Sequence, residues 1–418
     1  MTTVRQRGAL VRATLTLFGG NVVMLVLQAL QFLLLARVLG ADEFGRLAAA
    51  NALITILIPL AGLGYGNVLL MRVARAPAEL NSSLGSALFT TAALGLLLTG
   101  GVVVVAAFVY GAKISAALVA IMAINELFWV RIMVVLAQMY QALDKAVTCS
   151  VLNAAVSLCR IGAVLVLFFS GSRQAELWAV SSFALLSALG TVALLAACRS
   201  FGRPVLNMQR LWEDRSEAMH FSLGSAAKAL YTDLDKVVLA HVAPPAVVGA
   251  YTAAYRLIVM AFVPVRSLLD ASAASFFRKG SHGVENANQF AKKLLGFTLP
   301  YSLIAAVVML ALADAVPLVL GASFERSVPM LRCLAILPVI QAIHYVFSDV
   351  LTTSGLQALR SRLQWLIVCV YAVLAAIFIP RFGWQGAAGV CLLSESLFAI
   401  IVTTVVTMKS NAGMQRCR

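Results

Sequence analysis

Long apolar runs alternate with short polar breaks along the whole chain. A helix needs about 20 apolar residues to cross the hydrocarbon core of a bilayer. The runs are long enough for this, so the pattern predicts about twelve transmembrane helices. They fall near residues 14–36, 46–70, 84–110, 114–138, 147–170, 177–198, 219–241, 248–277, 294–320, 329–354, 363–380 and 386–408.

The composition agrees with this pattern. The 418 residues are 61% hydrophobic and 12% charged, and the mean hydropathy is +0.94. Soluble domains are roughly 45–50% apolar and about 25% charged. Soluble enzymes, disordered scaffolds and secreted disulfide modules are therefore excluded. The spans leave no room for a domain outside the membrane. The first apolar run, residues 13–36, is longer than a signal-peptide core and is predicted to be a retained span.

The basic residues predict the orientation of the spans. With the N-terminus in the cytoplasm, nineteen Lys and Arg residues fall in cytoplasmic segments and six on the opposite side. The positive-inside rule thus favours an even number of spans, with both termini cytoplasmic. The nineteen are Arg5, Arg7, Arg12, Arg72, Arg75, Lys145, Arg199, Arg203, Arg210, Arg215, Arg278, Lys279, Lys292, Lys293, Arg360, Arg362, Lys409, Arg416 and Arg418. The net charge of +15 is explained mainly by topology, so no nucleic-acid partner is expected.

The longest cytoplasmic connection, residues 199–218, divides the chain near its middle. It predicts an N-terminal lobe of six helices in residues 1–198 and a second six-helix lobe in residues 219–418. A faint repeat at an offset of 204 relates the two: Leu-Ala-Arg-Val at 35–38 corresponds to Leu-Ala-His-Val at 239–242. Both halves begin on the same side, so the repeat is parallel, as in transporters. The predicted fold class is an all-α polytopic membrane protein with two lobes around a central cavity.

Polar residues inside the spans point to that cavity. Each charged side chain at the bilayer centre costs about 2.5–3.5 kcal/mol on insertion scales, so these residues are expected to face protein or water. They recur at helical spacing: Ser150, Asn153, Ser157 and Arg160 in one span, Ser225, Lys228, Thr232 and Asp235 in another. Two readings stay open, a water-filled and partly cationic cavity or dry hydrogen bonding between helices. The predicted cavity lining is Asn21, Gln28, Gln31, Asn153, Ser157, Tyr231, Thr232, Tyr255, Gln341, Tyr345 and Ser348.

A cationic cavity suggests an anionic solute, with phosphate or diphosphate as the favoured class. The acidic residues of the spans, Glu126, Asp233, Asp235, Asp349 and Glu395, could balance neighbouring charges or take up protons or Na⁺. No other chemistry is indicated. The seven cysteines and four histidines have no metal-ligand spacing, so no metal or cofactor is expected. The glycines at 62, 64 and 66 lack a preceding strand, and they predict close packing or a helix break.

Four segments resemble Wzx-type polysaccharide-unit flippases. They are Arg37-Val-Leu-Gly-Ala-Asp-Glu-Phe-Gly45, Gly62-Leu-Gly-Tyr-Gly-Asn-Val-Leu-Leu-Met-Arg72, the pair Leu234-Asp-Lys-Val-Val-Leu-Ala240 and Val248-Gly-Ala-Tyr-Thr-Ala-Ala-Tyr-Arg-Leu257, and Ile379-Pro-Arg-Phe-Gly-Trp-Gln-Gly-Ala-Ala-Gly389. They follow the family's order and cover essentially the whole chain. Some members carry two further C-terminal spans, which this chain lacks.

The resemblance implies a flippase of the bacterial inner membrane, not an enzyme, that carries undecaprenyl-diphosphate-linked oligosaccharide by alternating access, driven by an ion gradient. The Wzx-type flippase family belongs to a superfamily that includes multidrug extrusion transporters. Membrane lipids, a polysaccharide polymerase and a chain-length regulator are the implied partners. On this reading Arg160, Lys228, Arg256 and Arg266 bind the diphosphate, and Glu126, Asp235 and Asp349 serve ion coupling or charge balance. The alternatives are a multidrug antiporter, which should have an acidic cavity, and a membrane-embedded glycosyltransferase or ligase, which should need a larger catalytic loop.

Overall fold

The computed structural model describes the backbone of residues 2–416 and the side chains of residues 24–411 apart from position 274. This part of the chain is helical throughout, with turns and no strand. The predicted cavity residue Asn21 lies outside the described side chains.

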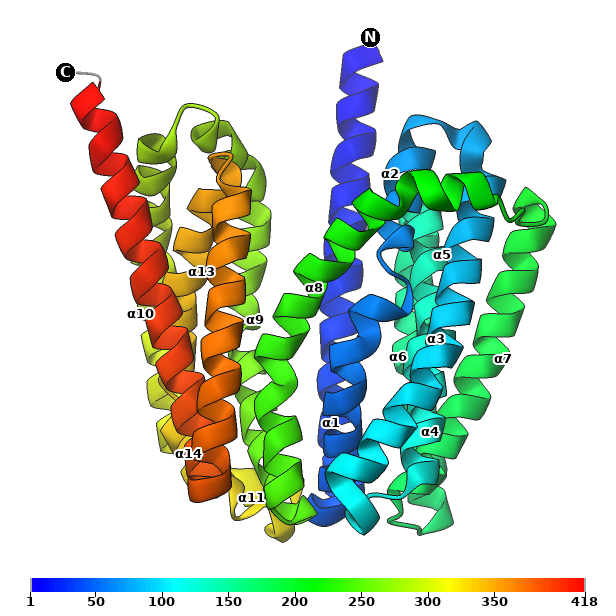
Figure 1. The fold of residues 1–418 in the computed structure, drawn as a ribbon, viewed down its shortest axis with the longest axis vertical. Coiled ribbons are helices and arrows are strands. Elements are labelled where there is room, and N and C mark those ends of the chain that lie inside the picture. The colour runs from blue at the N-terminus through cyan, green and yellow to red at the C-terminus, as the bar shows by residue number, and fades with distance from the viewer. Residues whose placement is uncertain (1, 417–418) are drawn as a thin grey trace. The chain divides into compact units, whose positions relative to one another are not determined.

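Fourteen α-helices follow one another along the chain (Figure 1). They are α1 (Thr2–Ala61), α2 (Tyr65–Arg75), α3 (Leu80–Tyr110), α4 (Ala116–Ile124), α5 (Val130–Ala142), α6 (Ala146–Ser170), α7 (Ala175–Phe201), α8 (Met208–Val242), α9 (Pro245–Gly280), α10 (Val284–Leu312), α11 (Val316–Leu320), α12 (Ser327–Leu334), α13 (Leu337–Thr353) and α14 (Gln357–Arg416). A π-helix, η3 (Asn125–Trp129), joins α4 to α5. Four 3₁₀-helices connect other elements: η1 (Pro77–Glu79), η2 (Gly111–Lys113), η4 (Ala313–Ala315) and η5 (Ala322–Phe324).

Nine helical segments within the described residues are long and apolar enough to cross a membrane. Two of them, in α1 and α14, each contain a glycine with non-helical backbone angles, Gly40 and Gly383. Each therefore holds two of the predicted spans. The second half of α8 supplies the remaining predicted span, 219–241, although its charged side chains keep it out of the nine. The twelve-helix prediction is confirmed.

The glycine-rich segment after α1 is a helix break that packs closely against α8. Leu63 and Gly64 both have positive φ, 42° and 78°, and they separate α1 from α2. A β-carbon placed on Gly64 would lie 2.3 Å from the carbonyl oxygen of Ala218. Conformation and space both require glycine here. The sequence predicted either close packing or a break, and the structure has both.

The chain forms two compact units, residues 1–233 and 234–418. Six residues without regular secondary structure, 202–207, follow α7, and α8 then begins within the first unit (Figure 1). Tyr65 donates a hydrogen bond of 2.6 Å to the carbonyl oxygen of Leu211, and the Val205 N–H donates one of 2.9 Å to that of Asn81. The predicted linker, 199–218, is thus partly helical and is fixed to the first unit. The boundary between the units lies further on, inside α8.

The second unit packs α9, α10, α12, α13 and α14 around a core of large side chains. Tyr251, Tyr371, Phe276 and Phe324 are fully buried in it. Its helices also share polar contacts, since Ser327 donates a buried hydrogen bond of 2.9 Å to a carbonyl oxygen of α9. The core of this unit therefore contains polar as well as apolar groups.

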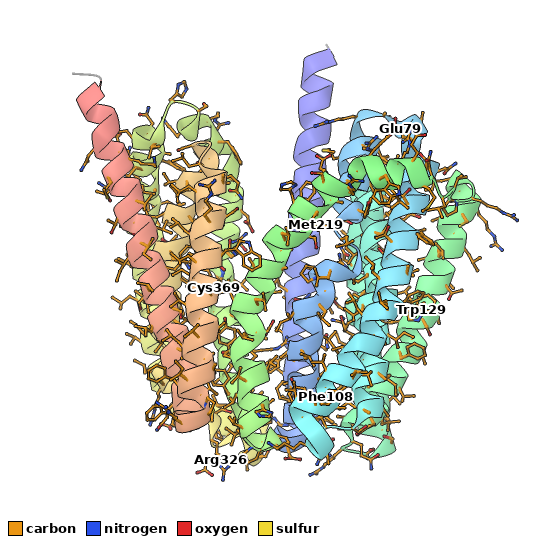
Figure 2. The ribbon with its side chains drawn as sticks, in the orientation of Figure 1. Glu79, Phe108, Trp129, Met219, Arg326 and Cys369 are labelled. Carbon is orange, nitrogen blue, oxygen red and sulfur yellow. The ribbon has the colours of Figure 1, made fainter. Side chains whose placement is uncertain are left out.

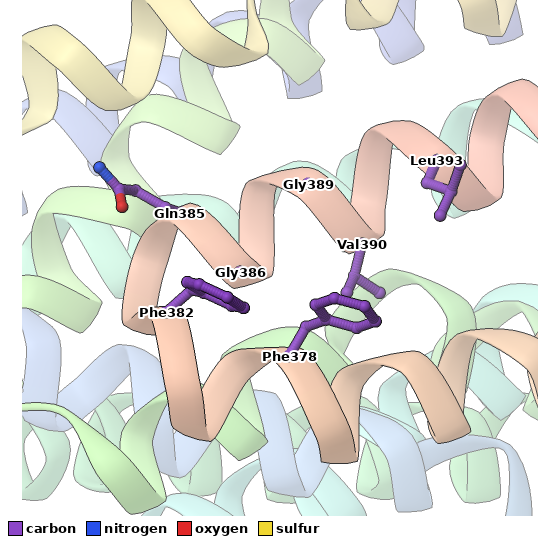
Figure 3. A pocket seen from close by; sticks show the side chains of 7 residues that line it. All are labelled: Phe378, Phe382, Gln385, Gly386, Gly389, Val390 and Leu393. Atoms are coloured by element: carbon purple, nitrogen blue, oxygen red, sulfur yellow. The ribbon is translucent and has the colours of Figure 1, made fainter.

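Large apolar side chains cover much of the outer surface. Phe108, near one end of α3, is 85% exposed (Figure 2). On α14 a shallow groove of about 390 Å³ lies between Phe378, Phe382, Val390 and Leu393 (Figure 3). Exposing such a surface to water would be unfavourable in free energy, whereas in a bilayer it contacts lipid chains that are also apolar. The exposed surface is therefore that of a membrane protein.

Candidate functional site

In the first unit, a widened turn places an acid against an arginine. The π-helix η3 carries Glu126, whose Oε1 lies 2.5 Å from the guanidinium of Arg160 on α6. Both side chains are largely buried. Asn125 donates a hydrogen bond of 3.3 Å to Ser182 on α7, which ties the turn to a third helix. Single π-helical turns inside α-helices frequently mark functional sites.

Two glycines make room for this turn. A β-carbon on Gly95 of α3 would lie 2.4 Å from the carbonyl oxygen of Leu127, and one on Gly190 of α7 would lie 2.6 Å from the ring of Trp129. Figure 2 shows Trp129 on the side of the unit that α7 covers. The wide turn and its neighbours are therefore fitted to each other, so the position of Glu126 is fixed by packing.

A second ionic cluster lies where α8 begins. Arg72 of α2 forms a salt bridge with Asp214 of α8 and lies 3.6 Å from Glu79, which is labelled in Figure 2. Glu79 in turn accepts a hydrogen bond of 2.8 Å from Arg210. Burial tends to lower the pKa of the Arg72 guanidinium, but the hydrogen bond and attraction to Asp214 outweigh it and raise that pKa, so Arg72 stays charged. The cluster fastens α8 to the first unit.

In the second unit, Asp235 and Lys236 at the end of α8 are both buried. The Lys236 Nζ lies 3.5 Å from Asp235 Oδ1 and 4.1 Å from the ring centre of Tyr255. Tyr251 donates a hydrogen bond of 2.7 Å to Asp235 Oδ2. A cation and a phenol thus balance this carboxylate. The carboxylate of Asp235 therefore contacts the side chain of the next residue in the chain.

A third polar group joins α13 to α14. Glu395 accepts a hydrogen bond of 3.1 Å from Gln341 Nε2, and its other oxygen lies 2.8 Å from His344 Nδ1. His344 is 4% exposed and Glu395 3%. The imidazole stacks on Tyr345 at 4.3 Å and lies 4.7 Å from the ring of Phe398. An acid and a base are therefore held in contact within an apolar core.

Further along α13 the charged side chains pair with each other. Asp349 lies 3.8 Å from Arg360 at the start of α14. Arg266 of α9 lies 3.3 Å from Asp270, one turn away on the same helix, and its guanidinium lies 5.3 Å from the ring centre of Tyr345. The predicted cation Arg266 and the predicted acid Asp349 thus each have an oppositely charged partner.

The other predicted residues vary in exposure. The side chains of Lys228, Arg256 and Gln28 are exposed, and those of Ser157 and Ser348 are buried. Partly buried are Gln31, Asn153, Tyr231 and Thr232. The four predicted diphosphate ligands are divided between the units, with Arg160 and Lys228 in the first and Arg256 and Arg266 in the second. Within the described residues, no group of three His, Cys, Asp or Glu side chains could hold a metal ion.

The family model described as "Polysaccharide biosynthesis protein" matches residues 10–273, more than half of the chain. The chain belongs to this family. A search of curated protein sequences finds no significant match.

Solved structures with this fold are transporters. An inward-facing multidrug resistance MATE family transporter of the MOP superfamily is similar with a TM-score of 0.73 at 15% identity, over 91% of this chain and 95% of that one. An outward-facing one gives 0.65 at 16% identity, over 97% and 96%. A MOP superfamily transporter from Pyrococcus furiosus Vc1 (DSM3638), described as having a binding pocket of reverse polarity, gives 0.66 at 16% identity, over 97% and 96%. This member of the polysaccharide biosynthesis family has the same fold as these transporters, and the predicted all-α fold with two lobes is confirmed.

Sequence reasoning did not single out His344 and Glu395 as a site. His344 was counted only among the four histidines without metal-ligand spacing, and Glu395 only among the five acidic residues of the spans. The signal that could have joined them is weak, because they are 51 residues apart and on different helices. Only the packing of α13 on α14 brings them into contact.

Proposed function

We propose that this protein flips undecaprenyl-diphosphate-linked oligosaccharide units across the bacterial inner membrane for the assembly of a surface polysaccharide. The observation that carries the proposal is the family match on a transporter fold. A polysaccharide biosynthesis protein built almost entirely of membrane helices is suited to moving a lipid-linked intermediate. Alternating access between the two sides would deliver the unit to a polymerase, with a chain-length regulator as a further partner.

A largely buried cation, Arg160, supports an anionic headgroup as cargo. Arg160 is held by Glu126 in a short ion pair inside the membrane region. A diphosphate offers a guanidinium the same bidentate hydrogen bonding as a carboxylate does, with more negative charge. It can therefore compete for Arg160. The exposed side chains of Lys228 and Arg256, with Arg266, provide further positive charge.

An ion gradient is the proposed energy source, and both termini are proposed to be cytoplasmic. The three acids first considered for ion coupling, Glu126, Asp235 and Asp349, each lie against a basic partner. Charge balance explains these pairs without a transported ion.

The second candidate function is a multidrug antiporter of the same superfamily. The solved MATE structures favour it through their fold. The family match favours the flippase because it names polysaccharide biosynthesis. A glycosyltransferase or ligase is less favoured, since the helices leave little chain outside the membrane region for a catalytic domain.

The test is deletion of the gene in its own bacterium, followed by measurement of surface polysaccharide and of lipid-linked oligosaccharide in the membrane. The flippase predicts loss of the polymer and accumulation of undecaprenyl-diphosphate-linked units that remain inaccessible from outside intact cells. Re-expression of the wild-type chain should reverse both. Normal polymer together with increased sensitivity to cationic drugs would favour the antiporter instead.

A further inference from the structure

Arg131 differs from Arg160, Arg266 and Arg360 in that no described acid lies against it. Those three arginines each lie close to a carboxylate. Arg131 belongs to the apolar segment Ala116–Ala142, which is long enough to cross a membrane. Within the described residues it forms no ion pair, and its buried Nε has no hydrogen-bond acceptor. Since a guanidinium stays protonated at all physiological pH values, this part of the first unit carries an unbalanced positive charge.

A second polar group without a partner lies beside this arginine. Helix α5, which carries Arg131, packs against α2 and α3 (Figure 1). Thr91 of α3 is 1% exposed, and its hydroxyl has no hydrogen-bond partner among the described residues. A β-carbon placed on Gly62, directly after α1, would lie 3.1 Å from Thr91 Oγ1 and 3.7 Å from Arg131 Nη2. The hydroxyl and the guanidinium therefore border the same small space beside the backbone of Gly62.

An anion with several oxygens would satisfy both groups at once. Buried polar groups are hydrogen-bonded in the large majority of cases, and a charged side chain at membrane depth normally pairs with another group. A guanidinium offers several N–H donors in one plane, and a hydroxyl offers one more. The oxygens of a phosphate accept charge-assisted bonds from such donors, and they can do so from two helices at a time. The donors of Arg131 and Thr91 thus suit a phosphate.

The side chain of Arg131 is accessible on one face of α5. The partly exposed residues Arg131, Val134 and Gln138 lie on this face, and every residue between them is buried. Gln138 donates a 2.9 Å hydrogen bond to Asn67 of α2, so the other polar side chain of this face already has a partner. A guanidinium that faces lipid is costly. The open side of Arg131 is therefore where a polar ligand reaches it.

The nearby end of α1 balances the charge of Arg131 only in part. Helix α1 ends at Ala61, next to Gly62, and the carbonyl end of a helix carries roughly half a negative elementary charge. One of the last carbonyl groups, that of Pro59, already accepts a 2.8 Å hydrogen bond from Ser222. The helix end attracts the guanidinium, but the rest of the positive charge is left for an anion to balance.

We propose that Arg131 and Thr91 form a phosphate-binding subsite of the first unit, which takes the phosphate ester of an anionic lipid. The inference rests on the proposed function in naming the diphosphate of the cargo as this ester, and the headgroup of a membrane phospholipid has the same chemistry. It also divides the work between two arginines. Arg131 receives a phosphate without breaking an ion pair, whereas Arg160 must first separate from Glu126.

The direct test is binding of geranyl diphosphate, a soluble prenyl diphosphate, to the full-length protein in nanodiscs of phosphatidylcholine, measured by calorimetry. We expect Arg131→Gln to weaken binding roughly 10- to 150-fold, because a charge-assisted hydrogen bond is lost. Thr91→Val removes a neutral donor and should weaken binding about 2- to 10-fold. Arg131→Lys keeps the charge but loses the planar grip, so its affinity should lie between those of wild type and Arg131→Gln.

Two substitutions provide matched controls for this measurement. Arg381→Gln removes an exposed arginine, and Thr99→Val removes a hydroxyl of α3 that is bonded to its own helix at Gly95. Both should bind geranyl diphosphate as wild type does. The subsite is overturned if Arg131→Gln also binds it with wild-type affinity. Should Arg131→Gln fail to fold, Arg131→Lys and Thr91→Val decide by the same measurement.

Thermal unfolding separates ligand binding from a structural role of Arg131. Without ligand, Arg131→Gln should be at least as stable as wild type, because it removes a charge that no described acid balances. Geranyl diphosphate should raise the unfolding temperature of wild type and leave that of Arg131→Gln unchanged, since only a state that binds the ligand is stabilised by it. An equal rise in both proteins would contradict the proposal.

Nanodiscs that also contain phosphatidylglycerol distinguish the two sources of the phosphate ester. The negative surface lowers the local concentration of geranyl diphosphate equally for both proteins, so the ratio of wild-type to Arg131→Gln affinity is the quantity to compare. We expect this ratio to persist, as it should for a site that prefers a diphosphate. Loss of the difference would show that phosphatidylglycerol occupies Arg131, and it would overturn the assignment to cargo.

The subsite and the flippase proposal can fail independently. If the wild-type chain does not restore polysaccharide export to cells that lack the gene, the flippase proposal fails, and the nanodisc measurements still decide whether Arg131 binds a diphosphate. If export is restored by wild type and Arg131→Gln binds geranyl diphosphate normally, only the subsite fails. When both proposals hold, Arg131→Gln should be present in wild-type amounts in the membrane and export no polysaccharide, whereas Arg381→Gln should export normally.

Discussion

Asp235 and Lys236 are neighbours in the chain and also ion-pair partners, with Nζ 3.5 Å from Oδ1 in a nearly water-free core. Adjacent residues on a helix normally point about 100° apart and do not meet. Here the backbone N–H of Lys236 also donates a 2.9 Å bond to Asp235 Oδ1, and Tyr251 donates to Oδ2. The carboxylate therefore turns toward its neighbour. This pair allows the second half of α8 to carry charges inside the membrane region.

Removing only the cation from this pair should destabilise the protein strongly. Lys236→Met leaves Asp235 buried with an uncompensated charge, which costs about 3–5 kcal/mol. The double variant Asp235→Asn/Lys236→Met removes both charges and should recover most of that loss. Denaturant unfolding in detergent measures the difference, and Lys279→Met at an exposed position is the control. Equal stability of the single and double variants would show that the pair is not what stabilises this region.

The ionic cluster at the start of α8 should protect the preceding loop and the first turns of this helix from proteases. Arg72→Ala leaves the buried Asp214 without its arginine, so the first turns of α8 should open more often. We expect faster cleavage in residues 202–215 during limited proteolysis, followed by mass spectrometry. Arg75→Ala, one turn further and exposed, should behave like wild type. Identical cleavage rates for both variants would contradict a fastening role.

Gly64 should not tolerate a side chain. Its φ of 78° and the 2.3 Å approach to the carbonyl of Ala218 both exclude a β-carbon, so Gly64→Ala should cost more than about 1 kcal/mol. Gly296→Ala is the matched control, since it lies in α10 with no atom within 4 Å of the new methyl group. It should be neutral or stabilising by up to about 1 kcal/mol. Thermal unfolding of both variants decides, and a Gly64→Ala protein as stable as wild type would contradict the packing argument.

The polar stripes predicted from the sequence should differ in access to water. Thr232 is only partly buried, whereas Ser348 is fully buried. A cysteine at position 232 should therefore react faster with a small hydrophilic thiol reagent than one at position 348, on a background without native cysteines. A cysteine in place of Phe108, which faces lipid, gives the reaction rate expected where no water reaches the thiol. Fast reaction at position 348 would show that its surroundings open to water in another state.

The periodicity of apolar residues was sufficient to predict the helices, because length and hydropathy alone decide which segments enter a membrane. The periodicity missed the break at residues 63–64, since the predicted span 46–70 runs through it, but the glycines at 62, 64 and 66 indicated close packing or a break there. The partners of the buried charges could not be predicted. Glu126 contacts Arg160 because a π-turn changes the direction of the Glu126 side chain, and no residue pattern predicts that turn. Likewise, Glu395 meets His344 only because α13 packs against α14.

The contact between Glu126 and Arg160 leads to the last prediction, which separates a structural role of Arg160 from a role in cargo binding. Arg160→Gln leaves a buried acid behind and should lower stability. The double variant Glu126→Gln/Arg160→Gln has two neutral amides and should recover that stability.

If Arg160 only balances Glu126, the double variant should also recover polysaccharide export. If Arg160 binds the diphosphate, export should remain lost, because a charge-assisted hydrogen bond of about 1.5–3 kcal/mol is missing. This corresponds to roughly 10- to 150-fold weaker cargo binding. For the double variant we expect a restored unfolding temperature without restored export. Arg173→Gln, in an exposed loop, is the control for both measurements. Full export by the double variant would assign Arg160 to charge balance alone.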